Sequence, residues 1–174
     1  MNKILVVTIL ARDRPGIVKT ISETLVAHHA SWIDSRMANL ADRFAGLVQI
    51  SVTEDQLPSL RTALQSLHDA DNQLHLMVEE ANPKPESVIT NHLSLEVVGA
   101  DRPGIIDDLT GALIKLNVNI NALESEQREA SMSSELLFWA KLKLGLPQGV
   151  SNDDVQNALE ALSDQLMVDI DLSV

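Results

Sequence analysis

The sequence contains no cysteine and no tyrosine, and only two phenylalanines and two tryptophans among its 174 residues. The absence of cysteine excludes disulfides, thiol nucleophiles and cysteine-based metal sites, and it is compatible with a cytoplasmic protein. No apolar run approaches the roughly 20 residues that a membrane-spanning helix needs. Since aromatic residues are scarce while hydrophobic residues make up 45% of the chain, the sequence predicts a globular core of aliphatic side chains.

Positive charge is also scarce. Thirteen lysines and arginines stand against 25 aspartates and glutamates, which gives a formal net charge of -12 at pH 7. Residues 1–82 carry 7 basic and 10 acidic side chains (net -3), whereas residues 83–174 carry 6 and 15 (net -9). No basic cluster offsets this charge, so nucleic-acid phosphates and anionic membranes would both be repelled. We therefore expect no direct contact with nucleic acid or with membranes.

A segment of five residues, DRPGI, occurs at 13–17 and again at 101–105, 88 positions later. An apolar stretch precedes each copy. The apolar residues that follow the first copy, Ile17, Ile21 and Leu25, have the spacing of an amphipathic helix, and the second copy repeats this spacing. The chain therefore consists of two copies of one unit.

Each copy has the pattern strand–helix–strand–strand–helix–strand. Phe44–Val52 aligns with Leu136–Leu144, and both stretches are rich in strand formers. We place the units at 1–81 and 92–174, joined by a linker at 82–91 that contains two prolines. With right-handed crossovers, this order predicts an α+β fold of two tandem ferredoxin-like (βαββαβ) units, each with an antiparallel four-stranded sheet and helices on one face.

Capping signals mark the start of the second helix in each copy. Thr53 is followed three residues later by Gln56, and Ser151 is followed by Asp154 at the same spacing. A hydroxyl residue with an acidic or amide residue three positions on is typical of a capping box. We expect Ser151 to be an N-cap residue. In the first copy the signal is at Thr53, but Pro58, which is tolerated in a first helical turn, leaves the start of that helix open.

The repeated corner itself has the residue types of a helix start. We expect Asp13 and Asp101 to cap the helices and the prolines to preset φ in the first turn. The glycines, which lack a Cβ atom, would let a ligand or another chain approach the backbone. The N–H groups of the first turn favour a bound carboxylate or phosphate. The same residues also suit a corner that binds nothing, and both interpretations stay open.

A βαββαβ unit with an Asp-Arg-Pro-Gly corner and an Asn-Val-Asn-Ile turn resembles the ACT domain family of small-molecule regulatory modules. The turn is Asn117–Ile120 in the second copy, and Ala30–Ile33 takes its place in the first. The resemblance covers nearly the whole chain. It implies that an amino acid binds at an interface between two ACT domains. The implied ligand-binding residues are Asp13, Arg14, Gly16, Ile17 and Ser31 in the first copy, and Asp101, Arg102, Gly104, Ile105 and Asn119 in the second.

The two copies are not equivalent in this pattern. Ser31 takes the position of Asn119, so the resemblance favours the second copy as the stronger site. The bare tandem architecture resembles ACT proteins that sense a small amino acid such as glycine and repress transcription through a DNA-binding activator protein. We expect a homo-oligomer as well, because the open edge strands of such sheets need to be covered.

Nothing in the sequence indicates an enzyme. The five histidines lack metal-binding spacing, and there is no nucleophile elbow, phosphate loop or dinucleotide fingerprint. We expect no metal and no cofactor beyond an amino-acid effector. Two alternatives remain open: an amino-acid sensor that controls an enzyme or another target, and an oligomerisation domain that binds no ligand.

Overall fold

The computed structural model describes residues 1–71, 73–81, 89–129, 136–162 and 169–173. For residues 89, 90 and 169–173 only the backbone is described. The chain divides into two compact units, Met1–Pro83 and Lys84–Val174. In the described part of the chain, no helix is both long and apolar enough to cross a membrane.

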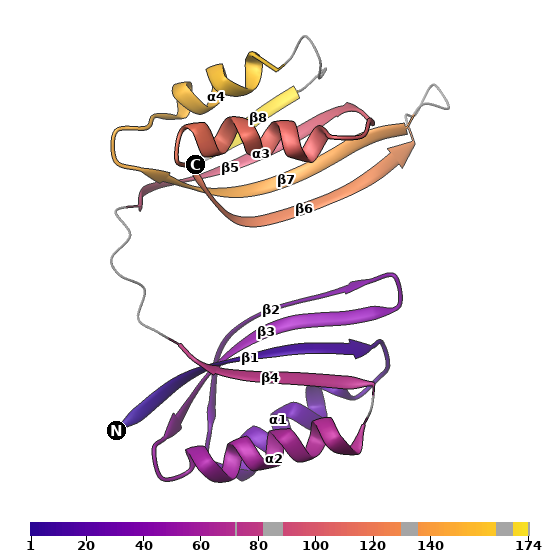
Figure 1. Cartoon of the computed structure of the whole chain (residues 1–174), viewed down its shortest axis with the longest axis vertical. Helices are drawn as coiled ribbons and strands as arrows, with labels where there is room; N and C mark the ends of the chain where they lie inside the picture. The colour runs from indigo at the N-terminus through magenta and orange to yellow at the C-terminus, as the bar shows by residue number, and fades with distance from the viewer. Residues whose placement is uncertain (72, 82–88, 130–135, 163–168, 174) are drawn as a thin grey trace. The chain divides into compact units, whose positions relative to one another are not determined.

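The first unit has the predicted order of elements. They are β1 (Asn2–Arg12), α1 (Ile17–Ala27), β2 (Ser31–Leu40), β3 (Arg43–Thr53), α2 (Leu57–Ala70) and β4 (Leu74–Glu80). The strands pair antiparallel in the order β2-β3-β1-β4, so β2 and β4 are the edges of the sheet. Both helices lie on one face of this sheet (Figure 1).

The second unit repeats this arrangement. Its elements are β5 (Ile89–Ala100), α3 (Ile105–Lys115), β6 (Asn119–Glu129), β7 (Leu136–Pro147), α4 (Asn152–Glu160) and β8 (Asp169–Ser173). The sheet order is β6-β7-β5-β8, again antiparallel, with α3 and α4 on one face (Figure 1). The prediction of an α+β fold with two βαββαβ units is confirmed.

Each unit has its own aliphatic core between the sheet and its two helices. Alternate residues of the central strand β1, namely Leu5, Val7 and Ile9, point toward the helices and are buried. Ile21 and Leu64 meet them from α1 and α2. Among the described residues, no polar or charged side chain is buried. Polar chemistry in this protein is therefore confined to strand ends, corners and outer surfaces.

Two predicted details differ from the structure. Strand β5 begins at Ile89, inside the predicted linker 82–91, and residues 82–88 lie outside the described residues. Phe44 pairs with Ala11 of β1, and Phe138 pairs with Gly99, which is the residue equivalent to Ala11 in β5. Phe138, and not Leu136, is thus the counterpart of Phe44. The alignment was wrong by two residues because the hairpin between β6 and β7 is longer than the one between β2 and β3.

The structure also shows where α2 starts, a point that the sequence leaves open. Its N-cap is Gln56, without a side-chain cap, and Thr53 is the last residue of β3. A cap at Thr53 would place Pro58 at the fifth helical position, where the backbone N–H must donate a hydrogen bond that proline lacks. The chain instead makes a turn in which Gln56 N–H donates to Thr53 O over 3.1 Å, and Pro58 lies in the first helical turn.

The predicted N-cap at Ser151 is confirmed, and the structure shows that Ser151 and Asp154 form a capping box. Asp154 N–H donates to Ser151 Oγ (3.2 Å), and Ser151 N–H donates to Asp154 Oδ2 (2.8 Å). The hydrogen bond from the Ser151 hydroxyl, followed by the one from the Ser151 backbone, lowers the pKa of Asp154 below the usual 3.8.

We expect wild type to be more stable than Asp154→Asn at neutral pH and to lose this advantage in acid. A lowered pKa in the folded state contributes stability that is complete above the pKa of the unfolded state, and this stability is lost as the pH falls through the lower folded-state pKa. Urea unfolding of both proteins between pH 7 and pH 2 measures the difference. An advantage that is independent of pH would contradict this role of the Asp154 carboxylate.

Candidate functional site

Glycines, and not the aspartates, cap the helices at the two DRPG corners. Gly16 (φ +100°) and Gly104 (φ +88°) are the N-cap residues of α1 and α3, and neither helix has a side-chain cap. The expectation that Asp13 and Asp101 cap the helices is wrong. Each aspartate lies three residues before the N-cap glycine, and each proline lies in the intervening turn, outside the first helical turn.

Backbone conformation is the reason for glycine at these two positions. A Cβ atom on Gly16 would meet no atom within 4 Å, so close approach of a neighbour does not require glycine there. The positive φ does require it, because side chains with a Cβ atom rarely adopt this conformation. The glycine turn starts each helix at a defined residue, and the first N–H groups of the helix have no partner within it.

We expect Gly16→Ala to lower the free energy of unfolding by about 1–2 kcal/mol, because alanine is strained at positive φ. Gly111→Ala is the matched control. Gly111 lies inside α3 at an ordinary φ with open space around it, and alanine favours helix there by roughly 0.5–1 kcal/mol. Urea denaturation of the three proteins should give shifts of opposite sign. Equal effects of the two substitutions would contradict this explanation.

The corner aspartates bond instead to the ends of strands β2 and β6. Asn39 Nδ2 donates to Asp13 Oδ2 (2.5 Å), and Gln127 Nε2 donates to Asp101 Oδ2 (2.6 Å). The backbone supports the same junction, since Asp13 N–H donates to Asp42 O over 2.9 Å. The carboxylate at each corner is thus held beside the opening of a helix without capping it.

The two corner arginines have different partners. Arg14 forms an ion pair with Asp71 at the C-cap of α2. Arg102 forms an ion pair with Asp108 in the first turn of its own helix, α3. The Nε atom of Arg102 is buried and has no partner among the described residues. Both guanidinium groups therefore carry structural ion pairs, and a ligand carboxylate would have to compete with them.

Ile17 and Ile105 belong to the cores, where their side chains are 3% and 4% exposed. Only their backbone N–H groups are available to a ligand. The charge around these groups differs between the corners. Lys19 lies in the first turn of α1, whereas Asp107 and Asp108 lie in the first turn of α3. Lys19 forms an ion pair with Glu23, and Asp108 forms one with Arg102, so the openings differ mainly by the negative charge of Asp107.

Ser31 lies far from the corner of its own unit. It pairs with Ser51 of β3, which pairs with Ile4 of β1. Asp13 follows nine residues after Ile4 along the same strand direction. At 3.3 Å per residue, the two positions are about 30 Å apart. One unit alone does not bring Ser31 and Asp13 into one site.

Asn119 occupies the corresponding position in the second unit. It lies level with His92 at the start of β5, whereas Asp101 follows the end of that strand. The Asn119 side chain donates to Asn121 Oδ1 over 2.6 Å. Within its own unit, Asn119 therefore gives no advantage to the second corner.

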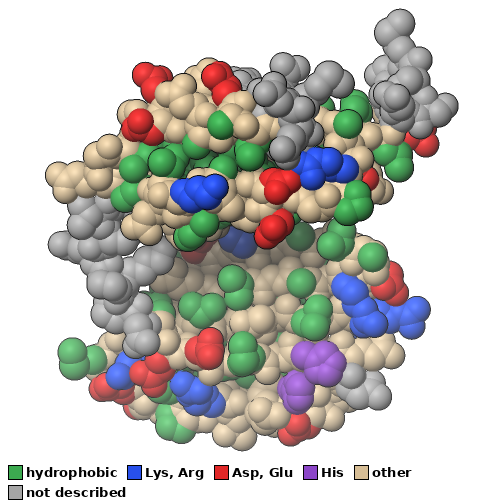
Figure 2. Space-filling model, turned by 45° about the horizontal axis from the view of Figure 1, so that its top comes forward, with side chains coloured by type: hydrophobic (Ala, Val, Ile, Leu, Met, Phe, Trp, Pro, Cys, Tyr) green, Lys and Arg blue, Asp and Glu red, His purple; other side chains and the backbone are tan. Residues whose placement is uncertain are grey.

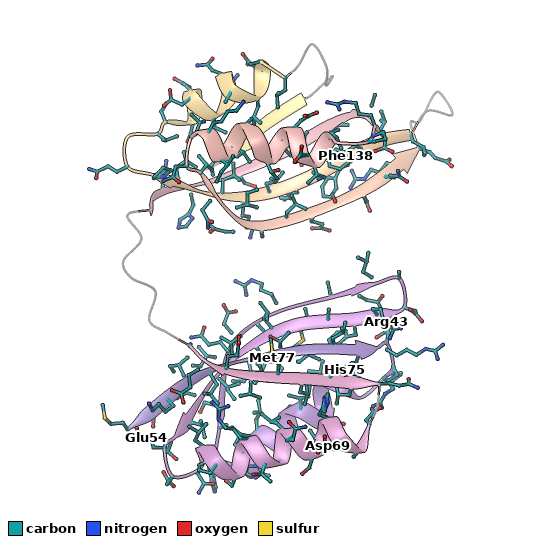
Figure 3. The ribbon with its side chains drawn as sticks, in the orientation of Figure 1. Arg43, Glu54, Asp69, His75, Met77 and Phe138 are labelled. Atoms are coloured by element: carbon teal, nitrogen blue, oxygen red, sulfur yellow. The ribbon has the colours of Figure 1, made fainter. Side chains whose placement is uncertain are left out.

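The residue that donates a hydrogen bond to the aspartate at each corner was missed from the sequence; it is Asn39 in the first unit and Gln127 in the second. Asn39 lies opposite Phe44 in the sheet, and Gln127 lies opposite Phe138, which is labelled in Figure 3. These are the two phenylalanines of the chain. A signal was present, because Asn39 follows Asp13 by 26 residues and Gln127 follows Asp101 by the same number.

Comparison with known proteins gives a family match for the first unit and relatives for most of the chain. Residues 3–78 match the ACT domain family. Over 162 residues, the chain is 25% identical to the glycine cleavage system transcriptional repressor of Escherichia coli (strain K12), and it is equally similar to the repressor of Shigella flexneri. These alignments cover 93% of this chain and 85% of each relative.

Two crystal structures resemble the chain over nearly its whole length. One is a protein of unknown function from Galdieria sulphuraria, with 28% identity and a TM-score of 0.85, covering 99% of this chain and 98% of the other. A second is a protein assigned as a glycine cleavage system transcriptional repressor, with 21% identity and a TM-score of 0.71 over 99% and 97%. The second likeness concerns the fold alone. The first unit of the chain matches the ACT domain family, and the chain is similar over most of its length to glycine cleavage system transcriptional repressors.

Proposed function

We propose that this protein is an amino-acid-responsive regulator of transcription that acts through a protein partner. The observation that carries the proposal is the pair of corners, each of which presents a carboxylate beside the open first turn of a helix. An amino acid carries a cationic ammonium group next to an anionic carboxylate. Asp13 or Asp101 can accept hydrogen bonds from the ammonium group, and helix N–H groups can donate to the carboxylate.

Glycine is the effector we propose first. The named relatives are repressors of the glycine cleavage system, and they are regulators rather than enzymes. We assign the stronger carboxylate contact to the first corner, because Asp107 adds a negative charge at the opening of α3 and the first turn of α1 has no acidic residue. The sequence-based preference for the second copy, which depends on Asn119, is the alternative assignment.

Charge supports an indirect route to DNA. The formal net charge is -12. On the face drawn in Figure 2, lysine and arginine side chains lie in small groups with carboxylates nearby, and they form no continuous basic surface among the described residues. Such a surface does not attract phosphates. We propose that a DNA-binding activator protein in the cytoplasm, contacted by a homo-oligomer of this chain, carries the regulatory effect.

Purification of the tagged chain from its own cells tests this route. It is done with and without about 10 mM glycine, which is a saturating excess over a weak site. We expect a transcription activator with a DNA-binding domain to co-purify in a glycine-dependent manner. In a mobility-shift assay, the chain alone should leave DNA unshifted. An enzyme as the specific glycine-dependent partner would instead identify a sensor that controls metabolism directly, and DNA shifted by the chain alone would contradict the charge argument.

A further inference from the structure

We propose that Asn39 and Gln127 are positioning residues of the amino-acid site at the two corners. Each amide orients the neighbouring aspartate so that one carboxylate oxygen stays available for the ammonium group of the ligand. This inference rests on the proposed function and adds to it two residues that the ACT resemblance did not supply.

The first argument is that the contact occurs twice. Asn39 lies at the end of β2 and Gln127 at the end of β6, and each donates its side-chain N–H to Oδ2 of the corner aspartate of its own unit. The side chains differ in length by one methylene group, yet the amide reaches the same acceptor. A single exposed hydrogen bond would be weak evidence, because such contacts contribute little to stability. Its recurrence at the same place in both units indicates a shared role.

The second argument is the state of the carboxylates. Within the described ranges, the amide is the one hydrogen-bond donor to Asp13, and the same holds for Asp101. In each case the amide contacts Oδ2 and leaves Oδ1 open. The aspartate backbone is fixed as well, since Asp13 N–H donates to Asp42 O and Asp101 N–H donates to Leu136 O. With the backbone and one oxygen held, the direction of the second oxygen is restricted before a ligand arrives.

The third argument is the rigid support behind each amide. Asn39 lies opposite Phe44, and Gln127 lies opposite Phe138, in the cross-strand positions where side chains touch. Phe138 is 6% exposed, and Phe44 packs against the core of the first unit. The amides therefore lie on paired strands, each opposite a phenylalanine that contacts the core.

Isothermal titration of the full chain with glycine tests the inference. In the variant Asn39→Asp with Gln127→Glu, a carboxylate of the same size replaces each donor and repels the corner aspartate. We expect the affinity for glycine to fall by about tenfold or more, since hydrogen bonds to charged groups are worth that factor. Exchanging the two amides, Asn39→Gln with Gln127→Asn, keeps both donors and should retain affinity within roughly threefold of wild type.

The matched control makes the same chemical change elsewhere. Gln65 and Gln156 also donate to carboxylates, Asp69 and Glu160, but each does so within its own helix, and neither amide contacts a corner aspartate. Gln65→Glu with Gln156→Glu adds the same two negative charges and should leave glycine affinity unchanged. Should the first variant prove less stable in thermal unfolding, Asn39→Ala with Gln127→Ala removes the donors without adding charge and should show the loss as well.

The outcomes separate the inference from the proposed function. Glycine binding that is equal in wild type and in Asn39→Asp with Gln127→Glu overturns the positioning role and leaves the amino-acid site in place. An equal loss in the Gln65 and Gln156 control also overturns it, because the loss would then be a general effect of charge. No binding of glycine by wild type rejects the proposed glycine site and this inference together.

Discussion

The variant Asp13→Asn with Asp101→Asn is expected to bind glycine about 30-fold or more weakly than wild type. The change removes the negative charge from both corners while keeping the size of the side chains. A charge-assisted hydrogen bond to an ammonium group is worth roughly 1.5–3 kcal/mol, and loss of the charge leaves the ammonium group without its partner. Isothermal titration with glycine measures the ratio of the two dissociation constants.

Glu54→Gln provides the control for this experiment. Glu54 directly follows β3, is labelled in Figure 3, and forms an ion pair with Lys3. Thr53, the last residue of β3, pairs with Asn2 at the start of β1, whereas Asp13 follows the end of β1, so we expect the replacement to leave glycine affinity unchanged. If the corner variant kept wild-type affinity, the ammonium contact assigned to Asp13 and Asp101 would be wrong.

The second large effect concerns stability. Leu109→Ala should lower the free energy of unfolding of the second unit by about 2–5 kcal/mol, the range for a fully buried leucine in a packed core. Leu109 is 1% exposed and belongs to the core between α3, α4 and the sheet. Chemical denaturation followed by circular dichroism measures the change.

Ile114→Ala is the control on the same helix. Ile114 is 67% exposed, so its truncation removes little buried surface and should cost less than about 0.5 kcal/mol. Similar costs for the two substitutions would contradict the core that the structure assigns to the second unit. The large difference is expected because α3 has one buried face, and these two residues lie on opposite sides of it.

The identical DRPGI segments lead to corners with different chemistry. Outside the five shared residues, Lys19 of α1 is replaced at the equivalent position by Asp107 of α3. Arg14 reaches across to the turn after α2, whereas Arg102 is held by its own helix through Asp108. The opening of α1 therefore has no acidic side chain in its first turn, whereas that of α3 has two, one of them paired with Arg102.

The fold could be predicted from the sequence because local patterns determine most of it. Strand and helix periodicity, and the repeat itself, were enough for the order of elements and for the aliphatic cores. The sequence left the start of α2 open because the pattern at Thr53 and Gln56 competes with the proline at position 58, and the proline decides where a helix can begin.

The candidate site was only partly predictable, because its contacts join residues that are distant in the chain. Local capping rules made Asp13 the expected helix cap, but its partner is Asn39, which only the pairing of β1 with β3 and of β3 with β2 brings close. The glycine turn at Gly16 then supplies the helix start that the aspartate was expected to provide. Sheet register of this kind depends on the whole hydrophobic pattern and on the lengths of the hairpins.

Isothermal titration of the wild-type chain with glycine, L-alanine and L-serine is the most direct test that this protein is an amino-acid sensor. We predict saturable heat with at least one of the three, strongest with glycine, and loss of that heat when both corner aspartates are replaced by asparagine. No heat with any of the three amino acids, at protein and ligand concentrations that would reveal millimolar binding, would contradict the proposed function and leave the repeated corners as structural elements only.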